Sequence, residues 1–294
     1  MLNLFSQASR SDAVVITGAS TGIGAACALA LDKAGYRVFA GIRNQADGDR
    51  LQRQAGPRLM PIRLDVTDPA SIAAASHTVT AMMGDRGLAG LLNNAGIGVA
   101  GPVELLPLAD WRRQFEVNLF GLIAATQTFL PLIRQGRGRI INMGSLAGRA
   151  SMPFMAPYAA SKHALEAVTD ALRIELQPWG IRVAIIEPGA IATPLWSKTN
   201  KDIENWEAAW SPDLKGIYQE GFTRIKEAAA AAGERAQPAS VVAEAVTHAL
   251  RSRRPKTRYL IGSDAAIRSY LALLLPDRLN DWLITRIVKL PRRR

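Results

Sequence analysis

Three polar side chains could together move a proton to or from a substrate oxygen. Tyr158 and Lys162 are four residues apart in the stretch Tyr-Ala-Ala-Ser-Lys, and Ser145 follows a β-like apolar stretch. Residues four apart lie on one face of a helix, so the phenol and the ammonium can face the same point. A cation about 4 Å away, at an effective dielectric near 20, can lower the pKa of a tyrosine by about three units. The serine hydroxyl can donate to the same oxygen, so the pattern predicts acid–base chemistry at a carbonyl or alcohol.

A glycine-rich stretch near the N-terminus predicts a site for a dinucleotide. Gly18, Gly22 and Gly24 follow an apolar run and lead directly into a helix-like stretch. Such glycines let the backbone approach a pyrophosphate, toward which the N–H groups at the helix N-terminus point. The spacing differs from the common G-x-G-x-x-G fingerprint, and an ordinary tight turn is the alternative interpretation.

The residue types that follow the second apolar run favour NADP(H) over NAD(H). An NAD site usually places an acidic residue about 20 residues after the glycines, where it binds the ribose 2′-hydroxyl. This sequence has Arg43 there and no carboxylate. A guanidinium matches a 2′-phosphate, although an arginine merely solvated at a strand end would look the same. Asp65, at the end of the next run, is a candidate for the adenine edge.

A small-residue stretch follows the fourth apolar run. Asn93, Asn94, Ala95 and Gly96 lack bulky side chains, which suits a backbone that passes close to a cofactor. Because asparagine pairs also favour plain turns, the turn remains an alternative interpretation.

The elements that must position these residues alternate along the chain. Seven β-like runs are expected at residues 13–16, 37–42, 59–66, 88–92, 139–143, 181–186 and 258–261. Helix-like stretches separate them, among them 23–34, 71–83, 111–134 and 158–176. Alternation of this kind predicts right-handed crossovers and a doubly wound, Rossmann-type α/β fold with a seven-stranded parallel sheet.

We expect a single domain over residues 1–294 with four parts. A core for cofactor and catalysis spans 11–194, a helical lid insertion rich in tryptophan spans 195–237, a last helix and strand span 238–263, and a basic helical tail spans 264–294. Apolar side chains near the lid predict an apolar substrate, although several of them could instead pack the lid against the core. The candidates are Ile97, Val99, Leu146, Met152, Phe154, Met155 and Trp196, and Ser145 and Tyr158 would touch the substrate oxygen.

Taken together, these motifs resemble the short-chain dehydrogenase/reductase family over residues 17–193. The resemblance implies a catalytic tetrad of Asn118, Ser145, Tyr158 and Lys162, in which Asn118 kinks its helix and holds a water that relays protons through Lys162. It implies a dimer or tetramer, and the long C-terminal extension looks like that of members acting on retinoids, steroids and other apolar alcohols. Including the residues implied by the resemblance, the expected cofactor site consists of Gly18, Ser20, Thr21, Gly22, Ile23, Gly24, Arg43, Asp65, Val66, Asn94, Ala95, Gly96, Tyr158, Lys162, Pro188, Gly189 and Thr193.

The charge of the chain is concentrated at its C-terminus. Residues 251–294 contain twelve Lys and Arg against three Asp, which is +9 of the net charge of +11. Five apolar residues recur there at helical spacing, so this tail could lie on an anionic membrane surface, or pack on the body or on a second subunit. These apolar residues are Leu279, Trp282, Leu283, Ile287 and Leu290. No motif for reading nucleic acid accompanies the charge, so we expect no nucleic-acid partner.

The remaining features predict a cytoplasmic protein without a metal. The single cysteine, Cys27, cannot form an internal disulfide, and neither metal-ligand spacing, a secretory signal nor a membrane span is recognised in the sequence. The sequence therefore predicts an NADP(H)-dependent oxidoreductase with Tyr158 as general acid and base. Two alternatives remain open: a reductase of carrier-bound 3-oxoacyl substrates, and a non-catalytic NADP(H)-binding regulator.

Overall fold

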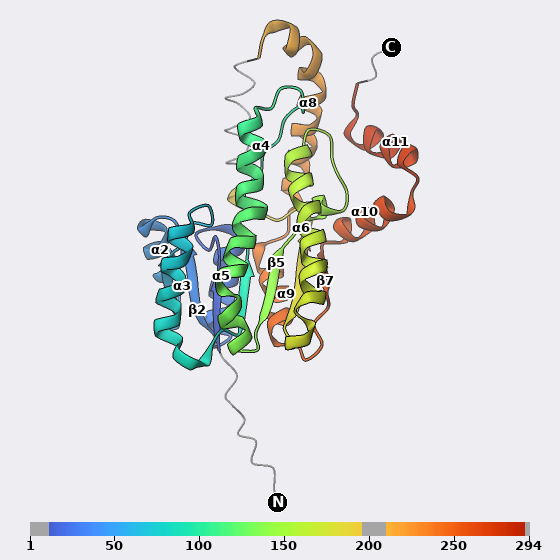
Figure 1. The fold of residues 1–294 in the computed structure, drawn as a ribbon. Coiled ribbons are helices and arrows are strands. Elements are labelled where there is room, and N and C mark those ends of the chain that lie inside the picture. Colours follow the sequence, from blue (N-terminus) through green and yellow to red (C-terminus); the bar gives the residue numbers. More distant parts are fainter. Residues whose placement is uncertain (1–11, 196–209, 292–294) are drawn as a thin grey trace, which may run out of the picture.

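A seven-stranded sheet forms the centre of the computed structural model, which describes residues 12–195 and 210–291. All neighbouring strands are parallel, and their order is β3-β2-β1-β4-β5-β6-β7 (Figure 1). The order reverses between β1 and β4, and ligands of open α/β sheets bind at such a switch point, beyond the carboxyl ends of the strands. The strands are β1 (Ala13–Ile16), β2 (Arg37–Ile42), β3 (Leu59–Arg63), β4 (Gly90–Asn93), β5 (Arg139–Met143), β6 (Arg182–Pro188) and β7 (Arg258–Ile261).

Helices cover both faces of the sheet. Because side chains alternate along a strand, Val14 and Ile16 of β1 pack with the helices on one face, while Ala13 and Val15 pack on the other. The first face is covered by α1 (Gly22–Lys33), α2 (Gln45–Gln52) and α9 (Ala239–Arg251), and the second by α3 (Pro69–Met83), α5 (Gly121–Gln135) and α6 (Ala156–Glu175). The predicted doubly wound fold is confirmed, and so are its seven parallel strands.

Three strands have bounds that differ from the sequence prediction. The third strand ends at Arg63 rather than at Val66, the fourth is Gly90–Asn93 rather than 88–92, and the sixth is Arg182–Pro188 rather than 181–186. Leu64 and Leu88 still form backbone hydrogen bonds, to Ile42 and Leu132, but the ladder partners of the strands stop short of them. Apolar character therefore extends beyond the sheet at both places, and an apolar run alone cannot show where pairing ends.

The stretch predicted as one helix over residues 111–134 contains a turn of different pitch. It consists of α4 (Leu108–Phe115), a π-helical segment, η2 (Glu116–Phe120), and α5. By length and composition, residues 108–135 could cross a membrane, but half of the apolar window is buried inside the fold. This burial is typical of a core helix in an α/β protein.

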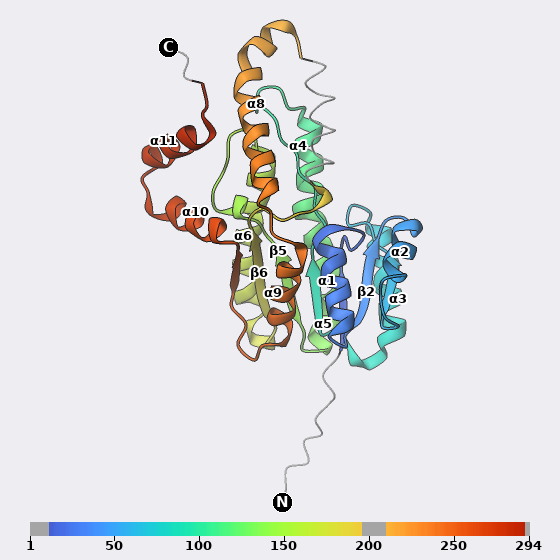
Figure 2. The same ribbon diagram turned by 180° about the vertical axis from the view of Figure 1, so that it is seen from behind.

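The C-terminal part builds a separate layer beside and above the sheet. Helix α8 (Pro212–Glu234) rises from the carboxyl end of the sheet, and α10 (Ser263–Leu274) and α11 (Asp277–Val288) lie outside both helical faces (Figure 2). The sequence predicted a basic helical tail over residues 264–294, and the structure has two helices there. They are separated at Pro276, which has no N–H with which to continue α10.

Candidate active site

A pocket of about 500 Å³ lies at the carboxyl ends of the strands, across the point where the strand order reverses. The structure brings all seventeen expected cofactor residues and the four expected tetrad residues together in its lining. Together these residues span more than 170 positions of the sequence, from Gly18 to Thr193. Their shared position shows that one ligand can contact all of these motifs.

The glycine turn between β1 and α1 is closely packed. Gly18 and Gly22 have φ values of 64° and 59°, which residues with a side chain rarely adopt. A Cβ atom at Gly24 would lie 2.2 Å from the carbonyl oxygen of Gly18. There is therefore no room for a side chain at Gly18 or Gly24, as a pyrophosphate cradle at a helix N-terminus requires.

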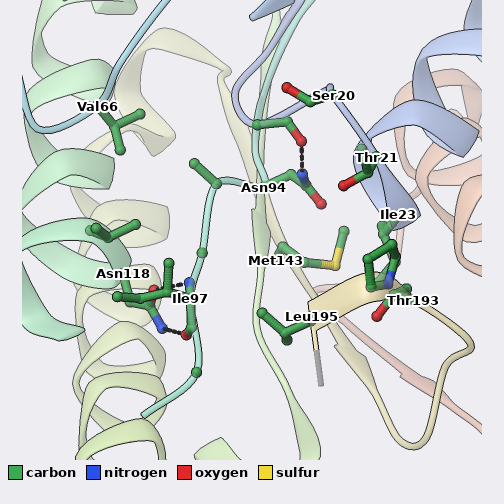
Figure 3. A pocket seen from close by; sticks show the side chains of 18 of the residues that line it. Ser20, Thr21, Ile23, Val66, Asn94, Ile97, Asn118, Met143, Thr193 and Leu195 are labelled. Atoms are coloured by element: carbon green, nitrogen blue, oxygen red, sulfur yellow. Dashed lines mark hydrogen bonds between the residues drawn. The ribbon is translucent and has the colours of Figure 1, made fainter. Parts of the chain in front are cut away.

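The Asn94 side chain holds this glycine turn in place (Figure 3). Its amide nitrogen donates to the carbonyl oxygens of Thr17 and Gly18 at 3.1 and 2.9 Å. In return, the Thr17 hydroxyl accepts from the backbone N–H groups of Asn94 and Ala95. The asparagine thus joins the loop after β4 to the loop after β1, a role that the composition of the loop did not reveal.

Arg43 lies exposed at the end of β2, at the far end of the pocket from Tyr158. Two residues that were not predicted, Asn44 and Asp47, also line the pocket there. The Asn44 side chain caps α2 by accepting a hydrogen bond from the Asp47 N–H. Asp47 pairs with Arg50, which also donates to the Ser20 carbonyl oxygen at 3.2 Å. Arg50 therefore compensates the charge of Asp47, and the exposed guanidinium of Arg43 lies beside this pair in the lining.

The side chains of Ser145, Tyr158 and Lys162 meet at the other end. Tyr158 is 7% exposed and Lys162 5%, and both line the pocket together with Ser145. Lys162 lies one turn along α6 from the tyrosine, with its Nζ 5.8 Å from the centroid of the phenol ring. The Nζ donates to the carbonyl oxygen of Met143 at 2.7 Å, which fixes the ammonium near the Tyr158 ring.

The pKa of Tyr158 differs from the argument made from spacing alone. Burial raises this pKa above its usual value, and the Ser145 hydrogen bond only partly offsets the increase. Burial also lowers the pKa of Lys162 to about 8, against the opposing effect of the Glu166 charge. Spacing revealed the attraction between the two groups but not the loss of solvation that each undergoes in the core.

Asn118 occupies the π-helical turn between α4 and α5, and its side chain is fully engaged. The Oδ1 atom accepts from the Ile97 N–H, and Nδ2 donates to the Ile97 carbonyl (Figure 3). Nδ2 also donates to the Ser161 hydroxyl. Gln114, one turn earlier and completely buried, holds the same loop through Ile97 and Val99. The widened turn agrees with the expected irregularity at Asn118, and its amide positions the loop beside the pocket.

Ser145 and Tyr158 line the pocket, but most of the apolar residues expected to contact the substrate are not part of its lining. Leu146 packs with Ala150 and α10, and Phe154 makes an edge contact with Phe222 of α8 at 5.4 Å between ring centroids. Met155 belongs to the same apolar cluster as Phe154, whereas Trp196 falls outside the described residues. These contacts fit the alternative that apolar residues pack the lid onto the core. Of the apolar candidates, Ile97 lines the pocket itself.

A family model described as short chain dehydrogenase matches residues 12–204, about two thirds of the chain. The chain belongs to the short-chain dehydrogenase family. The family comprises oxidoreductases that use a nicotinamide cofactor, so the placement of the glycine turn and the Ser-Tyr-Lys group in one pocket has a direct chemical interpretation.

Relatives with curated names place the chain near one part of the short-chain dehydrogenases. Dehydrogenase/reductase SDR family member 9 of Bos taurus is 39% identical, over 92% of this chain and 86% of the relative. Retinol dehydrogenase 16 of Homo sapiens is 38% identical, over 93% of this chain and 89% of the relative. Retinol and 17-beta-hydroxysteroid dehydrogenases recur among the similar proteins, in agreement with the resemblance drawn from the sequence.

Solved structures of other short-chain dehydrogenases share the fold. One from Burkholderia cenocepacia, in complex with NADP, has a TM-score of 0.68 and 25% identity, covering 95% of this chain and 98% of that chain. A 3-ketoacyl-(acyl-carrier-protein) reductase from Brucella melitensis, complexed with NADH, has a TM-score of 0.69 and 25% identity, over 85% and 96%. Because both cofactors occur among these structures, the fold does not select between NADP and NAD.

Proposed function

We propose that this short-chain dehydrogenase transfers a hydride between NADP(H) and the carbonyl or hydroxyl carbon of an apolar substrate, with Tyr158 as general acid and base. The observation that carries the proposal is that Ser145, Tyr158 and Lys162 line the same pocket as the glycine turn, with the Lys162 Nζ 5.8 Å from the centroid of the Tyr158 ring. A general acid must lie within hydrogen-bond reach of the oxygen that it protonates. One substrate oxygen bound in this pocket can accept from both hydroxyls.

The roles of the three side chains follow from their positions. When bound, the nicotinamide cofactor supplies or accepts the hydride. Ser145 donates to the substrate oxygen as negative charge develops on it, and Tyr158 delivers the proton in reduction or removes it in oxidation. Lys162 stabilises the phenolate form of Tyr158, since its ammonium is held close by the Met143 carbonyl. The water relay through Asn118 remains part of the proposal, and the Asn118 side chain already has its partners in Ile97 and Ser161.

The preference for NADP(H) is proposed from the adenosine end of the pocket. The glycine turn fits a pyrophosphate, because a Cβ at Gly18 would lie 2.7 Å from the Ala95 Cα and so only bare backbone fits there. The exposed Arg43 can bind a 2′-phosphate through two parallel hydrogen bonds. The carboxylate of Asp47 is paired with Arg50, so its repulsion of such a phosphate is reduced.

The substrate class is proposed to be a retinoid, a steroid or a similar lipid-like alcohol or carbonyl compound. The names of several relatives indicate this class, and an aromatic and aliphatic cluster lies beside the pocket under α8. Apolar walls with few polar groups suit such ligands. The same resemblance supports a homo-oligomer.

We also propose that α10 and α11 form a peripheral membrane surface on an otherwise cytoplasmic protein. Seven large apolar side chains on these helices are between 47% and 74% exposed, far more than a packed tail would leave. They are Ile267, Tyr270, Leu273, Leu274, Leu279, Trp282 and Ile287. Packing on the body is carried by other residues, such as the buried Val288 and Leu290, which lies near Gly221.

The test is the change in nicotinamide absorbance with a panel of retinoid, steroid, medium-chain and aromatic substrates, and with carrier-bound 3-oxoacyl substrates. Tyr158→Phe should lower kcat by about 10²- to 10⁴-fold, since it removes the general acid, while NADPH still binds. Tyr270→Phe, an exposed tyrosine on α10, is the matched control and should keep full activity.

Three results would contradict the proposal. An active Tyr158→Phe enzyme would remove the tyrosine from the chemistry. Turnover limited to carrier-bound substrates would favour the acyl-carrier alternative. NADPH binding without turnover of any substrate would favour the non-catalytic regulator.

A further inference from the structure

A cluster of five charged side chains lies directly beyond the catalytic lysine. We call it the carboxylate cluster; it consists of Arg149, Glu166, Asp170, Glu187 and Arg258. Its members come from the loop after Ser145, from α6, from β6 and from β7. The cluster therefore connects the segments that carry the serine, the tyrosine and lysine, and the Pro188-Gly189 turn of the pocket.

Arg258 is the centre of the carboxylate cluster. Its Nη2 donates to Glu166 at 3.1 Å and to Asp170 at 2.7 Å, and its Nε lies 3.4 Å from Glu187. On the other side of Glu187, Arg149 donates at 3.2 Å and forms a second, closer ion pair. With every group ionised, the three carboxylates exceed the two guanidinium groups by one negative charge.

Two of the carboxyl groups are buried and share Arg258 as an ion-pair partner. Glu187 is fully buried and the Glu166 side chain is 13% exposed, and the second Glu166 oxygen, Oε1, is buried without a hydrogen-bond partner among the described residues. Two buried carboxylates beside one guanidinium repel each other, and a proton on one of them removes this repulsion and gives it an O–H to donate. Burial and then the Glu187 charge raise the pKa of Glu166 to about 7, and burial also raises the pKa of Glu187.

This carboxyl pair lies next to Lys162. Glu166 is one turn further along α6, so it faces the same side of the helix as the lysine. The segment after Ser145 closes over both: a Cβ at Gly148 would lie 3.0 Å from the Lys162 carbonyl oxygen and 3.3 Å from the Glu166 Cγ. The charge of Glu166 opposes the effect of burial on the Lys162 ammonium.

We propose that Glu166 and Glu187 hold one proton between them, and that Glu166 is a positioning residue that keeps Lys162 charged as the pair loses that proton. The second part rests on the proposed function, whereas the first concerns the protein alone. As the shared proton leaves, a second negative charge appears one helix turn from the ammonium. Lys162 then stays charged at a pH where burial alone would neutralise it, and continues to stabilise the Tyr158 phenolate.

The groups that face Glu166 from each packed element are accounted for. Lys162 and Asp170 flank it on α6, Arg149 faces it from the loop after Ser145, Glu187 from β6, and Arg258 from β7. Asp170 differs from Glu166 in its surroundings, because its side chain is 41% exposed and it also pairs with Arg173. Asp170→Asn is therefore a matched control, since it removes the same charge from Arg258 without altering the buried pair.

The shared proton is tested by infrared titration of the protein without substrate. The wild type should show the C=O band of a protonated carboxyl group that disappears as the pH rises through about 7. The band should be lost in Glu166→Gln and retained in Asp170→Asn. Absence of the band in the wild type near pH 6 would overturn the proposal, whatever the variants do.

The link to Lys162 is tested by the pH profile of kcat for alcohol oxidation. In Glu166→Gln the alkaline limb should move down by about one pH unit, the size of one partly screened charge interaction. In Asp170→Asn the alkaline limb should stay at the wild-type position. In Glu166→Asp, which keeps a carboxylate, it should lie close to the wild-type position. Equal shifts in the Gln and Asn variants would show a general charge effect and refute the positioning role. An infrared band in a protein that turns over no substrate would support the shared proton and count against the proposed function instead.

Discussion

Arg43 offers a chemical means to distinguish the two nicotinamide cofactors at the level of one residue. Replacing it by serine should weaken NADPH binding by roughly 10- to 100-fold, because charge-assisted hydrogen bonds of a guanidinium contribute about 1.5–3 kcal/mol. NADH has no 2′-phosphate, so its affinity should stay the same. Fluorescence titration with both cofactors measures the two dissociation constants.

Arg63 provides the control for this measurement. It is also exposed at the end of a strand, β3, and it does not line the pocket. Arg63→Ser should leave both affinities unchanged. If NADPH and NADH binding fell equally in Arg43→Ser, the residue would contribute to the fold or to the adenine site rather than to phosphate recognition.

The buried Glu166 also makes stability depend on pH. Burial raises the pKa of Glu166 in the folded state to about 7, above its ordinary value of 4.5, so the folded state binds more protons than the unfolded state between these values. Stability must then fall as pH rises through this window, by up to about 3 kcal/mol for a single group. Glutamine does not titrate, so the free energy of unfolding of Glu166→Gln should improve relative to wild type from pH 5 to pH 8. Urea titrations at the two pH values measure this, and a constant difference between the proteins would contradict the raised pKa.

At the scale of the elements, four buried polar side chains tie the sheet to the catalytic helices. Asn93 of β4 donates to Thr126 of α5 and to Asn142 of β5, and Asn142 donates in turn to Thr169 of α6. Asn142 is completely buried. The row fixes the helix that carries Tyr158 against the centre of the sheet.

Removal of the central amide of this row should destabilise the protein. Asn142→Ala leaves an N–H of Asn93 without its partner and creates a cavity, so the free energy of unfolding should fall by roughly 2–4 kcal/mol. Urea denaturation measures the change. Asn280→Ala in the peripheral α11 should change stability by less than about 0.5 kcal/mol. A similar small effect at Asn142 would mean that the row contributes little.

Sequence predicted the elements well where periodicity and motifs coincide. The strands and the helices that follow them gave clear signals, and glycine spacing located the loop after β1. The resemblance implied a kink at Asn118, whereas the residue pattern alone predicted one helix over 111–134, and the structure has a π-helical turn there. The carboxylate cluster was not predicted at all. Arg149, Glu166, Glu187 and Arg258 are far apart in the sequence, and each one alone has the pattern of an ordinary surface charge.

At the scale of the whole molecule, the exposed tail carries the proposed membrane surface. Leu273 and Leu274 of α10 are each 74% exposed, and basic residues of α11 such as Arg278 and Arg286 stand nearby in the sequence. The proposed membrane surface predicts binding to phosphatidylserine-containing vesicles. The double variant Leu273→Ser and Leu274→Ser should lose at least about tenfold in affinity for these vesicles, because it lacks two side chains that would enter the lipid.

Vesicle sedimentation measures this binding. Phosphatidylcholine vesicles without phosphatidylserine should bind the wild type more weakly, since the basic charge then has no partner. Ala228→Ser and Ala229→Ser on α8 form the control pair and should bind as the wild type does. If the leucine variant sediments like the wild type but elutes as a smaller species in gel filtration, the surface joins two subunits instead.

The position of Arg258 also sets the order in which the protein can mature on the ribosome. It lies on β7, the last strand to be synthesised, yet it supplies the central cation for Glu166 and Glu187, made more than 70 residues earlier. Before β7 has emerged from the ribosome, the nascent chain contains Ser145, Tyr158 and Lys162 but lacks this counter-charge. Such a chain can form most of the sheet, but its active centre becomes electrostatically complete only when the last strand pairs with β6.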